Sequence, residues 1–207
     1  MRHDGATSTT PTDATLIDRS LAGDDEAFVE LLHRHEAAVW GYLARRAGSG
    51  PAEDLVSEVW IAAFRARATY DPAFPVARPW LFAIARNVLR RHWRTRPDEE
   101  LEWDMSHRLV SSDPWPAVDE RLHGADTLRE ALAGLRPAER EVLALVVWEE
   151  LTVAEAARTV GIPAGTARYH LHRARMALRG ALGDQPAAGP PFVALDPVVG
   201  QAKGRLR

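Results

Sequence analysis

Residues 152–182 carry the pattern that decides the fold: TVAEAARTVGIPAGTARYHLHRARMALRGAL. A short apolar segment precedes a turn that contains Gly161 and Pro163, and a longer segment rich in arginine and histidine follows. Because proline has no amide hydrogen to leave unpaired in the first turn of a helix, we expect a second helix to begin near Pro163. Two helices joined by such a turn form a helix-turn-helix, the motif that places one helix in the major groove of DNA.

The second of these helices is expected to be amphipathic. Its apolar residues recur at spacings of four, three and four, at Ala167, Leu171, Ala174 and Leu178. The same spacing brings four basic residues together on another face: Arg168, His172, Arg175 and Arg179. Since residues 166–180 contain four arginines and no acid, this face suits a polyanion. The solvated face of an ordinary bundle and a membrane-surface helix are the alternatives, but leucine and alanine without tryptophan or phenylalanine make a weak lipid-facing side.

The composition indicates a folded chain that recognises its partners through local patches of charge. The chain has 207 residues, 46% of them hydrophobic, enough for one or two helical domains with tails. Its net charge of −3 means that nucleic-acid binding must come from clusters of basic residues. The absence of cysteine excludes disulfides, thiolate nucleophiles and most structural zinc sites.

No segment of the sequence predicts membrane insertion or export. The longest apolar run, residues 142–148, is far too short to cross a bilayer. Residues 1–14 lack the apolar core of a signal peptide, so a cytoplasmic protein is expected.

A second basic cluster is followed at once by an acidic segment. Residues 84–96 hold five arginines and no acid, whereas residues 98–120 hold eight acids and a single arginine. Prolines interrupt the acidic segment, so residues 98–118 are expected to form a flexible linker. Residues 1–17 and the proline-rich residues 183–207 are expected to be disordered tails.

The chain between the tails is predicted to be all-α and to form two small helical domains, residues 18–97 and 119–182. In the first, apolar residues step along one helix over residues 28–43, and Gly48 and Gly50 end it. Further helices are expected over residues 52–67 and from Trp80 onward, separated by a proline-rich loop at residues 70–79. In the second domain, a helix over residues 122–133 and an apolar helix through Val142 and Val146 precede the helix-turn-helix.

Three segments in this order resemble an extracytoplasmic-function sigma factor of the sigma-70 family. They are PAEDLVSEVWIAAFRA at residues 51–66, RPWLFAIARNVLRRHWR at residues 78–94, and the long segment at residues 135–178 that ends in the helix-turn-helix. The likeness covers residues 18–182, nearly everything except the tails. It implies a bacterial transcription initiation factor with two helical domains, sigma regions 2 and 4, which binds core RNA polymerase and directs it to promoter DNA. An anti-sigma factor is a further candidate partner.

The resemblance also implies which residues contact each partner. The core-polymerase docking helix corresponds to residues 52–67, with Asp54, Ser57 and Glu58 on its polar face; the family's usual glutamine stands here as Ser57. The helix for the −10 promoter element corresponds to residues 80–94, with Arg86, Asn87, Arg90, Arg91 and Arg94 as the DNA-binding set. The helix-turn-helix corresponds to the reader of the −35 element, with the set Thr166, Arg168, Tyr169, His172, Arg173, Arg175 and Arg179.

Relatives in this family capture an extruded base in the loop that corresponds to residues 70–78. Phe74 is the candidate for stacking on such a base. Trp80 is the other aromatic residue nearby, but a core position is favoured for it over a role in base stacking.

Other functional classes fit the sequence less well. A stand-alone repressor or activator explains the helix-turn-helix but leaves the first domain without a role. An enzyme is disfavoured because the eight histidines form no set with carboxylates at ligand spacing, so we expect no catalytic residue, metal or cofactor. A protein-interaction adaptor leaves the two arginine-rich faces unexplained.

Overall fold

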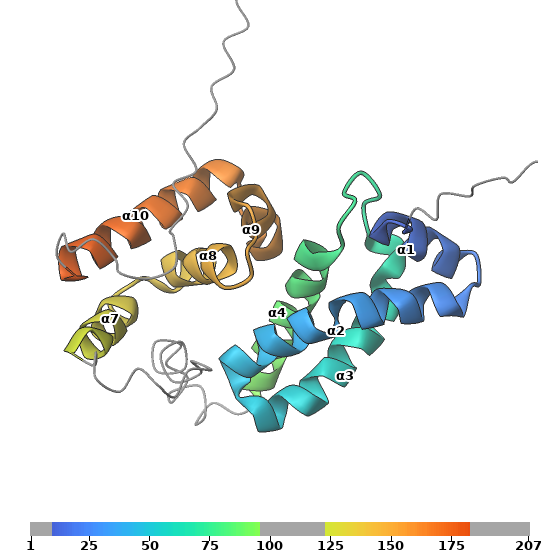
Figure 1. Cartoon of the computed structure of the whole chain (residues 1–207), viewed down its shortest axis with the longest axis horizontal. Coiled ribbons are helices and arrows are strands. Elements are labelled where there is room, and N and C mark those ends of the chain that lie inside the picture. Colours follow the sequence, from blue (N-terminus) through green and yellow to red (C-terminus); the bar gives the residue numbers. More distant parts are fainter. Residues whose placement is uncertain (1–9, 96–122, 183–207) are drawn as a thin grey trace, which may run out of the picture.

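The computed structural model describes residues 10–95 and 123–182, and every regular element in these ranges is a helix (Figure 1). The elements are α1 (Asp13–Leu21), α2 (Asp25–Ala47), α3 (Ser49–Ala66), a 3-10 turn (Arg67–Thr69), α4 (Arg78–Arg94), α7 (His123–Ala133), α8 (Pro137–Val147), α9 (Val153–Val160) and α10 (Ala164–Leu182). The all-α prediction is thus confirmed. The predicted acidic linker and the predicted C-terminal tail lie outside the described residues.

Helices α1 to α4 form the first domain around one apolar core. Long side chains from three of these helices are fully buried there: Leu31, Tyr42, Leu55 and Phe82. The rings of Tyr42 and Phe82 stack with their centroids 4.9 Å apart, which joins α2 to α4 at the centre of the domain.

The prediction that residues 1–17 are disordered is wrong for residues 13–17, which are part of helix α1. Thr12 caps the helix by accepting a hydrogen bond from the amide of Thr15 at 3.2 Å. Leu16 and Ile17 are buried in the core, and Asp13 contacts His35 of α2 at 2.7 Å. The segment owes its order to this tertiary packing, since nine residues are too few for a stable isolated helix.

Two helices begin earlier than the sequence indicated. Helix α3 starts at Ser49, directly after Gly48, whose φ of 86° ends α2. Helix α4 starts at Arg78 with Pro79 in its first turn, a position where proline is well tolerated.

Helices α7 to α10 form the second domain, in which α10 packs against α7, α8 and α9. The predicted helix-turn-helix is present as α9, a turn and α10. Thr152 and Glu155 form a capping box at the start of α9, with the Thr152 amide donating to Glu155 Oε2 at 2.8 Å. Gly161 ends α9 in the left-handed conformation, with φ 80° and ψ 38°.

The two domains contact each other, with α9 lying beside α4 (Figure 1). Leu145, Leu151 and Ala156 of the second domain are buried in the same apolar cluster as the core of the first. A smaller cluster beneath α10, with Leu143 and Leu171 among its members, belongs to the second domain alone. The contact between the domains was not predicted from the sequence.

Candidate nucleic-acid interface

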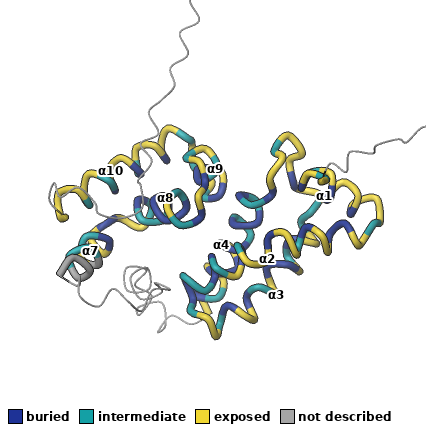
Figure 2. Tube along the Cα trace, in the orientation of Figure 1, coloured by how far each residue is buried: buried dark blue, intermediate teal, exposed yellow. Residues whose placement is uncertain are grey.

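Helix α10 presents a basic surface whose scaffold follows the predicted spacing. Ala167, Leu171 and Ala174 are buried against the second domain, as the apolar stripe predicted. Most of the predicted −35 set is exposed on the outer side of the helix (Figure 2): Thr166, Arg168, Tyr169, His172, Arg173 and Arg179. Tyr169 is 57% exposed, so its ring and hydroxyl are both accessible from solvent.

Two arginines of the −35 set differ from the others. Arg173 directs its Nε toward Oε1 of Glu139, 3.5 Å away. Glu139 is buried and also accepts a hydrogen bond from the Arg136 amide at 3.1 Å, so Arg173 helps to hold the start of α8. Arg175 is half-buried. The spacing of the basic residues did not distinguish these two from the rest.

Helix α4 presents the second basic surface. Leu81, Ala85, Val88 and Leu89 point into the core, which leaves Asn87, Arg90, Arg91 and Arg94 exposed along one side. Arg86, the first arginine of the predicted −10 set, is instead half-buried and lies 3.8 Å from Glu141 of the second domain.

The predicted polymerase-binding residues Asp54, Ser57 and Glu58 are all exposed on α3. Glu58 Oε2 accepts a hydrogen bond from Arg91 Nη2 of α4 at 2.5 Å. The predicted polymerase-binding face and the predicted −10 face therefore adjoin each other. Glu58 thus has a charged partner within its own domain.

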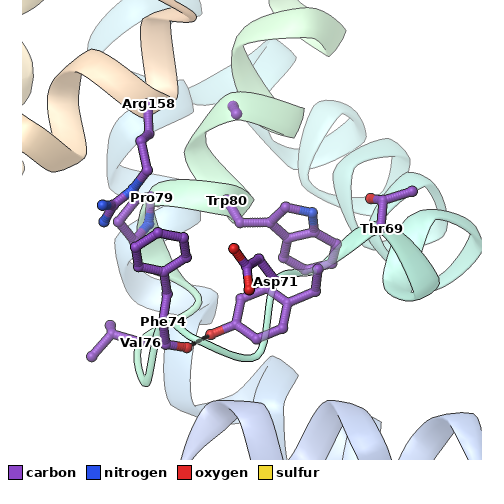
Figure 3. A pocket seen from close by; sticks show the side chains of 9 residues that line it. Thr69, Asp71, Phe74, Val76, Pro79, Trp80 and Arg158 are labelled. Atoms are coloured by element: carbon purple, nitrogen blue, oxygen red, sulfur yellow. Dashed lines mark hydrogen bonds between the residues drawn. The ribbon is translucent and has the colours of Figure 1, made fainter. Parts of the chain in front are cut away.

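A cavity of about 180 Å³ lies beside the loop between the 3-10 turn and α4 (Figure 3). Its walls include Tyr70, Phe74, Pro79, Trp80 and, from α9, Arg158. The rings of Tyr70 and Trp80 meet edge to face at 5.5 Å, and the Tyr70 hydroxyl donates a hydrogen bond to the carbonyl of Phe74. Burial raises the pKa of Tyr70 to about 12, so the hydroxyl keeps its proton, and can donate this hydrogen bond, further into the alkaline range than a free tyrosine.

The structure brings together residues that the sequence could only name separately. Phe74 was the candidate for base stacking and Trp80 was favoured as a core residue, and the two share the cavity. Trp80 is half-buried, which is intermediate between the core position favoured for it and an exposed stacking platform. Arg158 was not identified, although its Cζ lies 3.8 Å from the centroid of the Phe74 ring. No local sequence signal connects residues so far apart in the chain.

The described ranges contain neither a candidate metal site nor a candidate membrane span. They contain no cluster of three or more histidine, cysteine, aspartate or glutamate side chains that could hold a metal ion. None of their helices has the length and apolar character needed to cross a membrane.

Known proteins match both domains. The family description "Sigma-70 region 2" fits residues 31–97, and "Sigma-70, region 4" fits residues 125–178. The RNA polymerase sigma factor CarQ of Myxococcus xanthus is 34% identical over 176 residues, which cover 81% of this chain and 96% of CarQ. The ECF RNA polymerase sigma factor SigF of Caulobacter vibrioides is 36% identical over 168 residues, 79% of this chain and 89% of SigF.

Solved structures agree with these matches. The structure of CnrH in complex with the cytosolic domain of CnrY has a TM-score of 0.58 and 25% sequence identity, over 82% of this chain and 96% of CnrH. The fold is also that of the sigma factor RpoE of Bartonella quintana in its complex with the anti-sigma factor NepR, with a TM-score of 0.54 over 75% of this chain and 96% of that one. This chain belongs to the extracytoplasmic-function sigma factors of the sigma-70 family.

Proposed function

We propose that this sigma factor, which binds core RNA polymerase and directs transcription initiation at promoters, divides promoter recognition between α4 and α10. The observation that carries the proposal is the presence of two exposed basic helix faces, one in each domain. Because the two faces belong to different domains, they can contact two separate DNA elements. A stand-alone regulator would need only the second domain, whereas both domains of this chain match sigma regions.

Helix α10 is proposed to read the −35 element in the major groove. Arg168, Tyr169 and His172 lie in the N-terminal half of the helix, the part that reaches base edges in helix-turn-helix proteins. Arg179 lies near the C-terminal end and is suited to phosphate contacts, which set affinity rather than sequence preference.

Helix α4 and the loop before it are proposed to act on the −10 element. The exposed Asn87 carries both a donor and an acceptor for a base edge or a backbone group. Arg90 and Arg94 are exposed on the same helix and suited to phosphates of the separated strand. The cavity beside Phe74 offers an aromatic ring against which one unpaired base can stack.

The acidic face of α3, formed by Asp54, Ser57 and Glu58, is proposed to bind core polymerase. Because Glu58 already contacts Arg91, polymerase binding at this face would also affect the arrangement of the −10 surface. The proposal assigns no catalytic residue, metal or cofactor to the chain. It places the protein with the polymerase and the chromosome, in the cytoplasm.

A regulatory protein partner is also proposed. CnrH, to which this chain is similar over most of its length, was solved with the cytosolic domain of CnrY bound to it. An anti-sigma factor that covers one or both basic faces would keep this chain from promoter DNA.

Transcription in vitro tests the proposed function. Core polymerase is incubated with fragmented genomic DNA, with and without the full-length chain, and the 5′ ends of the transcripts are sequenced. We expect a set of start sites that depends on the chain and shares sequence elements near −10 and −35. An identical set of start sites in both reactions would contradict the proposal.

A further inference from the structure

We propose that the free chain is held closed by contacts between its two domains and that, in this closed form, Arg158 covers the loop proposed to capture a base. The part of this inference that concerns the base rests on the proposed function of Phe74, whereas the closure itself does not. Two groups of contacts carry the argument: a buried carboxylate shared between the domains, and the placement of α9 against the loop.

Glu149 is the centre of the contact between the domains. It lies in the turn between α8 and α9 and is only 3% exposed. Its carboxylate accepts hydrogen bonds from Arg45 Nη2 at 2.5 Å and from Arg46 Nη1 at 3.0 Å, and its carbonyl oxygen accepts one from Arg78 Nη1 at 3.0 Å. All three arginines belong to the first domain. A carboxylate is stable in such a buried position only while it is paired, so Glu149 fits this site only when the domains are together.

Further contacts surround Glu149. The Tyr42 hydroxyl donates to Glu141 Oε1 at 3.3 Å, and the hydroxyl of Thr159 donates to the carbonyl of Pro79 at 3.0 Å. Glu150, next to Glu149, adopts a left-handed backbone with φ 55°, which is uncommon for a residue with a side chain. The turn that presents Glu149 is therefore held in a conformation that the surrounding contacts must stabilise.

The contact between the domains lies over the base-binding loop. Thr159 is bonded to Pro79 at the start of α4, and the neighbouring Arg158 places its guanidinium over the Phe74 ring at 3.8 Å (Figure 3). A nucleobase that stacks on this face of Phe74 would have to occupy the space that the guanidinium fills. Arg158 and the base therefore exclude each other.

Closure affects the two DNA-binding surfaces unequally. Helix α10 packs against helices of its own domain, on the side away from α1 to α4 (Figure 1). Its basic residues stay exposed in the closed form. The −35 surface is thus available while the −10 loop is covered, and full promoter recognition requires the domains to separate.

A distance measurement on the free, full-length chain tests the closure. Because the chain has no cysteine, spin labels can be attached at I61C on α3 and M176C on α10, both at exposed positions. We expect one narrow distance distribution by pulsed electron spin resonance, and a longer, broader one after Glu149→Gln. The matched control is Glu150→Gln, which makes the same change one residue away at an exposed position. A broad distribution in the parent chain, or equal distributions in the two variants, would overturn the closure.

A DNA-binding measurement tests the cover over Phe74 and uses a fluorescent single-stranded oligonucleotide pool of random sequence. Losing a cation weakens DNA binding in general, so Arg168→Ala should lower the affinity. We expect Arg158→Ala, in contrast, to raise the affinity for the oligonucleotide pool by about fivefold or more. Fivefold corresponds to about the low end of what stacking of one base on an aromatic ring contributes. Since Arg158 is exposed at its outer edge, this variant is expected to fold even if Glu149→Gln does not. A lower affinity for Arg158→Ala would overturn the proposed cover.

A third variant separates failure of this inference from failure of the proposed function. Phe74→Ala in the Arg158→Ala background should abolish the gain in affinity. If Glu149→Gln lengthens the distance but Phe74→Ala has no effect in any background, closure stands and the base-binding role of the loop is wrong. If the distance never changes, the closure is wrong whatever the DNA measurement shows.

Discussion

The two basic helices differ in how far their charges are already engaged within the protein. On α10, among the described residues, Arg168 and Arg179 have no acidic side chain paired with them, whereas Arg173 contacts the carboxylate of Glu139. On α4, Arg86 lies near Glu141 and Arg91 is paired with Glu58. The −35 surface is therefore ready to bind, whereas the −10 surface is linked to the polymerase-binding face and to the other domain.

This difference suits the order of events at a promoter. Binding of duplex DNA requires only an exposed basic helix, whereas capture of an unpaired base is useful only once polymerase is present and the strands separate. We propose that the −10 surface responds to both, because its arginines contact the proposed polymerase-binding face and the second domain.

The largest effect is expected from removing the carboxylate that joins the two domains. Glu149→Ala leaves Arg45 and the buried Arg46 without this counterion, and breaking such a buried pair is expected to lower the free energy of unfolding by about 3–5 kcal/mol. Urea unfolding followed by circular dichroism measures it. Glu150→Ala is the control and should change the stability by less than about 0.5 kcal/mol. Equal effects would mean that the domains are not coupled through Glu149.

The next effect concerns polymerase binding. Reversing both charges of the α3 face, with Asp54→Lys and Glu58→Lys, sets positive charges against a polymerase surface that is expected to be basic as the proposed partner of an acidic face, and it also repels Arg91. We expect core binding to weaken by about a hundredfold, since juxtaposed like charges oppose binding by several kcal/mol. Affinity for a promoter fragment through α10 should not weaken, since the substitutions leave that helix intact and only add positive charge. The loss of affinity is measured as binding of the variant to immobilised core polymerase. A retained thermal unfolding transition shows that the variant is folded. Undiminished binding would place the docking face elsewhere.

A third prediction concerns the pH dependence of the first domain's stability. Burial acts to raise the pKa of Asp13, but hydrogen bonds from His35, the Ala77 amide and Arg34 outweigh it and hold the pKa below the usual 3.8. The carboxylate therefore stabilises the first domain at neutral pH, and this contribution is lost as the pH falls through the lowered pKa. Asp13→Asn should lower the free energy of unfolding at pH 7 by about 1.5–3 kcal/mol, as for hydrogen bonds to a charged group.

The pH dependence provides the check on Asp13. The difference in stability between the Asp13→Asn variant and the parent chain should shrink as the pH falls below the usual pKa of the carboxyl, because the parent carboxyl also becomes neutral. Asp18→Asn, at an exposed position of the same helix, is the control. A difference that stays constant with pH would show that Asp13 does not act through its charge.

A fourth prediction compares the two basic helices through salt. Arg168→Ala removes an exposed, unengaged cation from α10, and the slope of log affinity against log salt for promoter binding by the free chain should fall by about 0.9. Arg91→Ala should change the slope by less, because its charge is already balanced by Glu58. Equal changes would remove the contrast between the helices.

The sequence predicted what depends on local pattern. The spacing of Ala167, Leu171 and Ala174 located the buried stripe of α10, and Gly161 located the turn before it. The sequence did not predict what depends on distant residues. Helix α1 is ordered because Leu16 enters a core built by other helices, and Glu149 looks like one more surface acid until the fold brings Arg45 and Arg46 to it.

The properties of the candidate site also divide into those that local pattern predicts and those that it does not. Exposure of Arg168 and Arg90 follows from helical periodicity, so the sequence was sufficient to place both on outward faces. Engagement of Arg91 and Arg173 by Glu58 and Glu139 depends on how neighbouring helices cross. A helical wheel treats every basic residue on a face alike, and only the packed structure shows which of them are already in use.

The smallest predicted effect tests the pairing on which the contrast depends. Glu58 and Arg91 approach to 2.5 Å, but both side chains are largely exposed, with 48% and 59% of their surface accessible. An exposed pair of this kind contributes about 0.2–1 kcal/mol, so a double-mutant cycle with Glu58→Gln and Arg91→Gln in the free chain should give a coupling in that range. The coupling should fall as salt is added.

Repeating the cycle on polymerase affinity decides whether the pair has a function. If Glu58 must leave Arg91 to bind polymerase, Arg91→Gln should strengthen polymerase binding by a similar amount. The control is Arg94→Gln, at an exposed arginine on the same helix, which should not strengthen it. Equal effects of the two arginine variants would mean that polymerase senses only the overall charge of α4, and the −10 surface would then be independent of the polymerase-binding face.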